Sequence, residues 1–345
     1  MHFPVVFANV FTDEFILFAA AKEKQEQHME KRIKHKPLEE LNAFDGFMFN
    51  ELMNQEDRTQ AEDFCRTVLE PIVNRKIGKI EVISQRIIQG VDSSRHGIQM
   101  DAYIREYPEN DSEVDVVIDP AIYDIEPNDY VEASEEKRTR YYHALIDNHI
   151  LESGVKYDKL ERVFVIFILK YDPFGLDRMM YTIRRRCVEE PDMPYDDGDT
   201  TIFLYVYGRK DIPSQKLQDM LLFLVDSKDE NATDENLQRL NGMLKRLKAN
   251  KRVGEQYMHT WMREQHIREE AREEGREEGR KEGSEEKVLS QICRKLRKGK
   301  SLEQIADELE EDISGIESLY EVAQTFAPDY NEEQVFEAYK SMHVL

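Results

Sequence analysis

The sequence predicts an α/β fold, a mixed sheet flanked by helices, followed by a helical C-terminal arm. Before about Glu230, short runs rich in β-branched and aromatic residues alternate with segments of helical periodicity. Beyond that point the strand signals stop and charged helical sequence takes over. With 345 residues, of which 40% are hydrophobic, the chain can bury the core of one large domain and one smaller one.

The elements are predicted in order along the chain. Apolar residues at helical spacing predict two short helices within residues 44–72. Strands are expected at residues 79–88, 97–107, 114–118, 122–126, 163–169 and 201–207. Helices are expected at residues 135–151 and 214–224. Because a helix lies between the strands at 122–126 and 163–169, we expect a crossover between strands of one sheet.

The predicted division has four parts. Residues 1–40 form an N-terminal extension, 41–230 the α/β domain, 231–290 a charged helical arm and 291–345 a small helical segment. Residues 3–20 are apolar, but Asp13 and Glu14 interrupt the run and no basic segment precedes it, so neither a membrane span nor a signal peptide is expected. Met29 opens an alternative start of the chain.

The arm contains the repeat EEGREEGRKEGSEE, which places Gly275, Gly279 and Gly283 along one face of a helix. Each glycine costs a helix about 1 kcal/mol relative to alanine, and close approach of a second helix is a physical use for them. A homo-oligomer through the arm is therefore expected; the alternative is a low-complexity linker that frays. Three short helices are expected at 287–296, 301–309 and 313–322, the second capped by Ser301. The third is acidic, which favours packing over reading of base edges.

Charge and cysteine content restrict the function classes. A net charge of −23 argues against non-specific binding of a phosphate backbone over the whole surface. Local positive charge occurs at 137–140 and at 184–186, so a basic cleft remains compatible with the sequence. Cys65, Cys187 and Cys293 are far apart and form no zinc-binding pattern, which favours a reduced cytoplasmic setting.

Two acids occur within predicted neighbouring strands. Asp101 lies in the strand IQMDAYI, and Glu126 ends the strand IYDIE. Carboxylates that converge from adjacent strands are suitable ligands for Mg²⁺, the metal that hydrolysis of phosphodiesters commonly requires. Strand alternation places Glu126 on the same side as Asp124 and Asn128. The alternative is that these acids are ordinary half-buried carboxylates paired with nearby basic residues.

A succession of sequence blocks resembles the PD-(D/E)XK nuclease family transposases, which are related to recombination-promoting nucleases of bacteria. The blocks are HGIQMDAYI, YDIEPN, KRTRYYHALIDNHIL, VFVIFILKYDPFG with MMYTIRRRC, EEPDMPYDDGDTTIFLYVYG and the EEGREEGR arm, in that order. The resemblance extends from about Ala43 to the C-terminus. It implies a restriction-endonuclease-like core and a DNA endonuclease that uses Mg²⁺, with Mn²⁺ as a substitute.

The resemblance also implies roles for single residues. Asp101 and Glu126 match the acids that bind the metal and carry catalysis. Asn128 falls where the family has Gln or Lys, and Asn can only form hydrogen bonds. A third metal-binding acid from the helix before the first strand would be Glu62, whose alternative is an ordinary solvent-facing residue. Contacts to DNA phosphates are expected from the next helix, at Arg138, Arg140 and Tyr141.

Two functions remain from the sequence. The first is a metal-dependent DNA endonuclease associated with transposition or recombination. The second is a catalytically inactive protein with the nuclease fold, which acts as a DNA-associated or protein-interaction module through its helical arm.

Overall fold

The computed structural model describes residues 36–88, 97–107, 120–131, 134–151 and 153–343. The chain divides into two compact units, Met1–Met258 and His259–Leu345. Residues 1–35 of the expected N-terminal extension and the expected strand at 114–118 lie outside the described residues. Within the described part, no helix is both long enough and apolar enough to cross a membrane.

The first unit contains a mixed sheet of six strands in the order β1-β2-β3-β4-β6-β5. The strands are β1 Ile80–Ile88, β2 Ile98–Glu106, β3 Ala121–Asn128, β4 Arg162–Leu169, β5 Met180–Ile183 and β6 Asp199–Tyr205. The first three strands pair antiparallel, β3, β4 and β6 pair parallel, and β5 pairs antiparallel with β6. The short edge strand β5 was not expected from the sequence.

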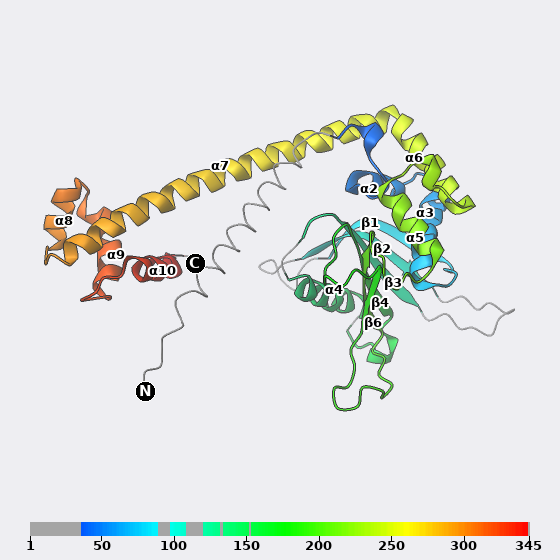
Figure 1. Cartoon of the computed structure of the whole chain (residues 1–345), viewed down its shortest axis with the longest axis horizontal. Coiled ribbons are helices and arrows are strands. Elements are labelled where there is room, and N and C mark those ends of the chain that lie inside the picture. Colours follow the sequence, from blue (N-terminus) through cyan, green and yellow to red (C-terminus); the bar gives the residue numbers. More distant parts are fainter. Residues whose placement is uncertain (1–35, 89–96, 108–119, 132–133, 152, 344–345) are drawn as a thin grey trace, which may run out of the picture. The chain divides into compact units, whose positions relative to one another are not determined.

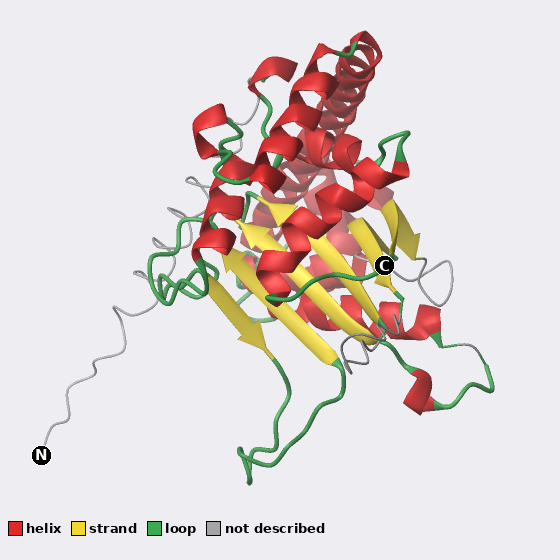
Figure 2. Ribbon diagram, turned by 90° about the vertical axis from the view of Figure 1, so that its right-hand side faces the viewer, coloured by secondary structure: helices red, strands yellow, loops and turns green. Residues whose placement is uncertain are grey.

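Helices cover both faces of this sheet (Figures 1 and 2). They are η1 Leu38–Glu40, α2 Gly46–Met53, α3 Arg58–Val73, α4 Glu135–Ile150, η2 Tyr157–Lys159, α5 Gln215–Val225, η3 Asp229–Asn231 and α6 Glu235–Ala249. α2, α3, α5 and α6 lie on one face and α4 on the other (Figure 1). The expected crossover is confirmed, because α4 connects β3 to its parallel neighbour β4.

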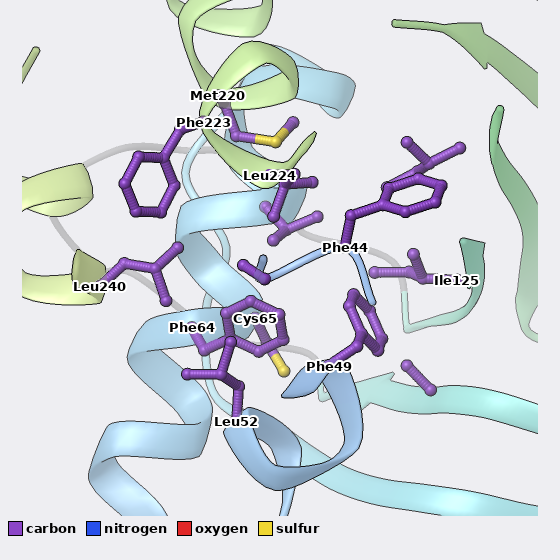
Figure 3. Close-up of a cluster of buried hydrophobic side chains, with 14 of the residues drawn as sticks. Phe44, Phe49, Leu52, Phe64, Cys65, Ile125, Met220, Phe223, Leu224 and Leu240 are labelled. Atoms are coloured by element: carbon purple, nitrogen blue, oxygen red, sulfur yellow. The ribbon is translucent and has the colours of Figure 1, made fainter. Parts of the chain in front are cut away.

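Strand alternation divides the core between the two faces. Ile125 of β3 belongs to the same cluster of buried side chains as Phe49, Phe64 and Phe223 from the helices of the first face (Figure 3). Its neighbours on the strand point the other way, where Ile122 packs under α4. β4 is buried on both sides, which explains its continuous apolar run VFVIFIL.

The first unit extends beyond the expected boundary at residue 230. α6 begins at a cap in which the Asp234 carboxylate accepts a hydrogen bond from the Leu237 N–H. Its apolar stripe, including Leu240 and Leu244, packs into the same core as α2 and α3. α6 is therefore part of the α/β unit, and charged helical sequence alone did not separate it from the arm.

The second unit contains most of α7 Lys251–Leu296, followed by α8 Leu302–Leu309, α9 Ile313–Gln324 and α10 Glu332–His343. The segment expected as a separate helix at 287–296 is the end of α7, a continuous helix of 46 residues. The expected capping of α8 is confirmed, since Ser301 and Gln304 form a reciprocal capping box. Leu289, Ile305 and Val335 belong to a separate small core in this unit.

Candidate functional site

The acidic residues of β3 line the face of the sheet that α4 covers. Asp124, Glu126 and Asn128 alternate along the strand and are 0%, 5% and 6% exposed. A strand places every second residue on the same side, so the sequence YDIEPN delivers three polar side chains into a largely apolar layer. Buried polar groups are costly unless they find partners, which marks this end of β3 as a specialised site.

Asp101 joins this site where β2 and β3 stop pairing through their backbones. The paired register runs from Glu106↔Ala121 to Ala102↔Ile125. At the next position the Asp101 N–H donates instead to Oε1 of Glu126, with an N–O distance of 3.0 Å. The Glu126 side chain thus takes the place of a backbone acceptor, and the two predicted acids are brought together.

The backbone is distorted at the same level of the sheet. Gln85 of β1 lies between Ser84 and Arg86, which pair with Ala102 and Met100, so Gln85 faces Asp101. Its φ is 49°, in the left-handed region that costs a non-glycine residue about 1–2 kcal/mol. Strained backbone of this kind is concentrated at functional sites.

One cation reaches the acids from α4. Arg138 Nη2 lies 3.4 Å from Oε2 of Glu126 and donates to the Tyr142 hydroxyl at 3.0 Å. Its guanidinium also lies over the rings of Tyr142 and Phe167, 5.2 and 5.4 Å from their centroids. These contacts hold Arg138 beside the acids, with its charge directed toward Glu126.

Burial and mutual repulsion make the acids difficult to ionise together. Burial, followed by the nearby Asp101 carboxylate, raises the pKa of Glu126 to about 8. Burial and the Glu126 carboxylate raise the pKa of Asp124 well above its ordinary value. Burial also raises the pKa of Asp101, and Arg138 partly opposes that rise. Arg138 therefore does not compensate the full negative charge of the site.

Two side chains of the site have hydrogen-bonding atoms without conventional partners. Neither carboxylate oxygen of Asp124 accepts from a described N–H or hydroxyl group, and its polar neighbour is the Glu126 carboxyl. The Asn128 Nδ2 group is also buried without an acceptor among the described residues, whereas its Oδ1 accepts from the Tyr130 N–H at 3.0 Å. A bound cation would satisfy the oxygens of such a site.

The oxygen ligands of the site suit a hard divalent ion that takes only part of its ligands from the protein. Asp101 and Glu126 supply carboxylate oxygens, which Mg²⁺ and Mn²⁺ prefer. In the described part of the chain, no three or more His, Cys, Asp and Glu side chains are grouped so as to hold a metal ion. One or two carboxylates, completed by water and phosphate oxygens, are a usual arrangement for Mg²⁺.

The remaining expected site residues lie elsewhere. Glu62 is on α3, on the opposite face of the sheet, and its carboxylate pairs with Arg66 at 3.0 Å. Arg140 and Tyr141 are exposed on α4, whereas Arg138 on the same helix turns toward Glu126. The structure thus brings Asp101, Glu126, Asn128 and Arg138 together and separates the other three from them.

Sequence reasoning gave no role to two polar residues of the site. Asp124 had a detectable signal, since it shares the alternation of Glu126 and Asn128. Tyr142 was assigned to the inward stripe of its helix, but its hydroxyl accepts from Arg138. The spacing of four residues between Arg138 and Tyr142 is the helical signal for that contact.

Comparison with known proteins gives no family for this chain. No family model, curated protein or solved structure matches it.

Proposed function

We propose that this chain is a divalent-metal-dependent DNA endonuclease of the PD-(D/E)XK type, associated with transposition or recombination. The observation that carries the proposal is the juxtaposition of Asp101 and Glu126. They come from neighbouring strands, the Asp101 backbone N–H donates to the Glu126 carboxylate at 3.0 Å, and the two carboxyl groups are close enough for Asp101 to raise the pKa of Glu126. Two converging carboxylates of this kind are what Mg²⁺-dependent phosphodiester hydrolysis needs.

The arrangement of elements also supports the proposal. The resemblance requires an acid on one strand, the second acid on the next, and helices on both faces of a mixed sheet. Asp101 lies on β2, Glu126 lies on the adjacent β3, and the sheet is mixed and covered on both sides. The agreement with the resemblance concerns the order and position of the elements. Support for catalysis therefore comes from the side chains of the site.

Each residue of the site has a proposed part in binding and orientation. Asp101 and Glu126 hold the metal ion, and Asp124 orients Glu126 through their carboxyl contact. Arg138, about a quarter exposed, offers its guanidinium to a phosphate next to the acids. When bound, the ion would neutralise the carboxylates and polarise the scissile phosphate. Asn128 can hydrogen-bond but supplies no positive charge.

Nicking of supercoiled plasmid in the presence of Mg²⁺ or Mn²⁺ tests the proposal. We expect cleavage by the parent chain, and a loss of at least about 100-fold in Asp101→Ala and in Glu126→Ala. Glu62→Ala is the matched control, because it removes an acid on the opposite face of the sheet. Cleavage that survives both site substitutions would show that the activity lies elsewhere or comes from a contaminant.

A catalytically inactive nuclease-fold protein is the second candidate. The observation that favours it is Asn128, which stands at the Gln or Lys position with its Nδ2 group unpartnered. The net charge of −23 adds to it, because a chain this acidic is a poor general binder of DNA. Absence of cleavage together with DNA binding or protein capture that depends on the arm would favour this function.

A further inference from the structure

The middle of α7 is an exposed helical segment; near its C-terminal end, Glu282 pairs with Lys340 of α10 at 3.6 Å. Residues 266–284 are solvent-exposed throughout. A Cβ atom built on Gly275, Gly279 or Gly283 would meet nothing within 4 Å. No contact among the described residues therefore requires glycine at these positions.

The repeat is poorly suited to a helix that remains alone. Three glycines cost such a helix about 3 kcal/mol relative to alanine. The four-residue period also places like charges four residues apart, as in Arg272 and Arg276 or Glu274 and Glu278. Such pairs destabilise an isolated helix, and the oppositely charged pairs three residues apart, such as Glu273 and Arg276, offset part of this cost.

The same period separates the charges onto two flanks. Ala271, Gly275 and Gly279 are each preceded by Glu and followed by Arg. Consecutive residues are about 100° apart around a helix, so Glu lies on one side of the small residues and Arg on the other. The acidic flank consists of Glu270, Glu274 and Glu278, and the basic flank consists of Arg272, Arg276 and Arg280.

This charge order distinguishes between possible arrangements of two copies. When two identical helices pair in parallel, opposite flanks face each other, so Arg would meet Glu on both sides. When they pair antiparallel, each flank faces its own kind, so Arg would meet Arg and Glu would meet Glu. Charge complementarity therefore selects a parallel pair.

We propose that residues 268–280 of α7 pair in parallel with the same segment of a second copy of the chain, the basic flank of each helix against the acidic flank of the other. The small residues let the two backbones approach closely. Because the row of small residues winds about 40° around the helix in each repeat, the helices cross over a few turns. This pairing is independent of the proposed nuclease activity.

Charge reversal in the full-length chain tests the pairing by sedimentation over the micromolar range. One variant carries Arg272→Glu, Arg276→Glu and Arg280→Glu, and the other carries Glu270→Arg, Glu274→Arg and Glu278→Arg. Each variant alone should associate at least about tenfold more weakly than the parent, and an equimolar mixture should recover association. Recovery in the mixture would also show that each variant is folded. A monomeric parent, or variants that associate like the parent, would overturn the proposal.

Disulfide cross-linking determines the orientation. Ala271→Cys and Gly279→Cys are introduced separately into a Cys187→Ser background, because Cys65 and Cys293 are buried. A parallel pair should give dimers when at least one of these variants is oxidised alone. An antiparallel pair centred on Gly275 would instead cross-link only in the mixture of the two variants, and that result would refute the parallel arrangement.

Discussion

The backbone N–H of Asp101 donates to the Glu126 carboxylate at 3.0 Å, at the point where β2 and β3 cease to pair. The bond fixes one oxygen of Glu126 and leaves the other directed toward Arg138. Because this bond forms where the backbone pairing of β2 and β3 ends, the position of the Glu126 carboxylate depends on the separation of these two strands. Substitutions here should therefore affect both stability and any metal-dependent activity.

Glu126→Gln should reduce the pH dependence of stability of the metal-free protein. In the folded chain the pKa of Glu126 is raised from 4.5 to about 8, mainly by burial. Between these values the folded chain keeps a proton that the unfolded chain releases, so stability falls as pH rises. One such proton corresponds to about 1.4 kcal/mol per pH unit. Urea unfolding in EDTA at about pH 5 and about pH 8 measures the slope.

The pKa of Asp124 is also raised, so some slope should remain in Glu126→Gln. Addition of Mg²⁺ should stabilise the parent more at high pH than at low pH, because the ion competes with the proton. Equal slopes in the parent and in Glu126→Gln would mean that Glu126 is ionised in the folded protein. The high pKa of this residue would then be wrong.

Arg138→Ala should weaken DNA binding and cleavage, whereas Arg140→Ala should have little effect. Both substitutions remove one positive charge from the same helix, which makes them a matched pair. Only Arg138 lies beside Glu126, and its ring contacts hold it there. We expect a loss of about 1–3 kcal/mol in binding for Arg138→Ala, measured by fluorescence anisotropy with Ca²⁺ in place of Mg²⁺. Equal losses in both variants would indicate a diffuse electrostatic effect.

Asn128→Lys should increase cleavage. Asn128 shares the buried face of β3 with Glu126, and its Nδ2 group lacks an acceptor among the described residues. A lysine there would add a positive charge beside the acids, and one preorganised group that stabilises developing charge is worth about 100- to 1000-fold in rate. Plasmid nicking measures the gain, with Asn128→Ala as the control for loss of the amide. No cleavage by either the parent or Asn128→Lys would favour the inactive function.

Short-range patterns predicted most of the elements in the first unit. Alternation and β-branched runs located β2, β3, β4 and β6. A strand buried on one face has alternating apolar residues, and a strand buried on both faces has a continuous apolar run. β5 was missed because it is a four-residue edge strand whose Thr182 and Ile183 are exposed. α6 was assigned to the arm because its outer face is charged, although its inner face belongs to the core.

For the site, the local sequence pattern predicted which residues share a face of a strand. It did not predict which residues of different elements meet. Alternation within β3 correctly places Glu126 and Asn128 on one face with Asp124. The contact of Glu126 with Asp101 requires the register between β2 and β3, which no local pattern specifies. Arg138 and Arg140 are two residues apart on a helix, so only the docking of α4 decides which of them turns toward Glu126.

Replacing the three glycines of the repeat by alanine should have opposite effects on the helix and on its association. Gly275→Ala, Gly279→Ala and Gly283→Ala together should stabilise isolated α7 by about 3 kcal/mol, since a Cβ at each position meets no atom of the described residues within 4 Å. The methyl groups at positions 275 and 279 would stand between the two closely paired helices and should weaken the dimer. Circular dichroism during thermal unfolding measures the stability of the helix, and sedimentation measures association.

The matched control is Glu273→Ala with Glu277→Ala. Both residues lie on the side of the helix away from Gly275, so this variant should leave association unchanged. Stronger association in the glycine variant would mean that the pair forms through another face of α7.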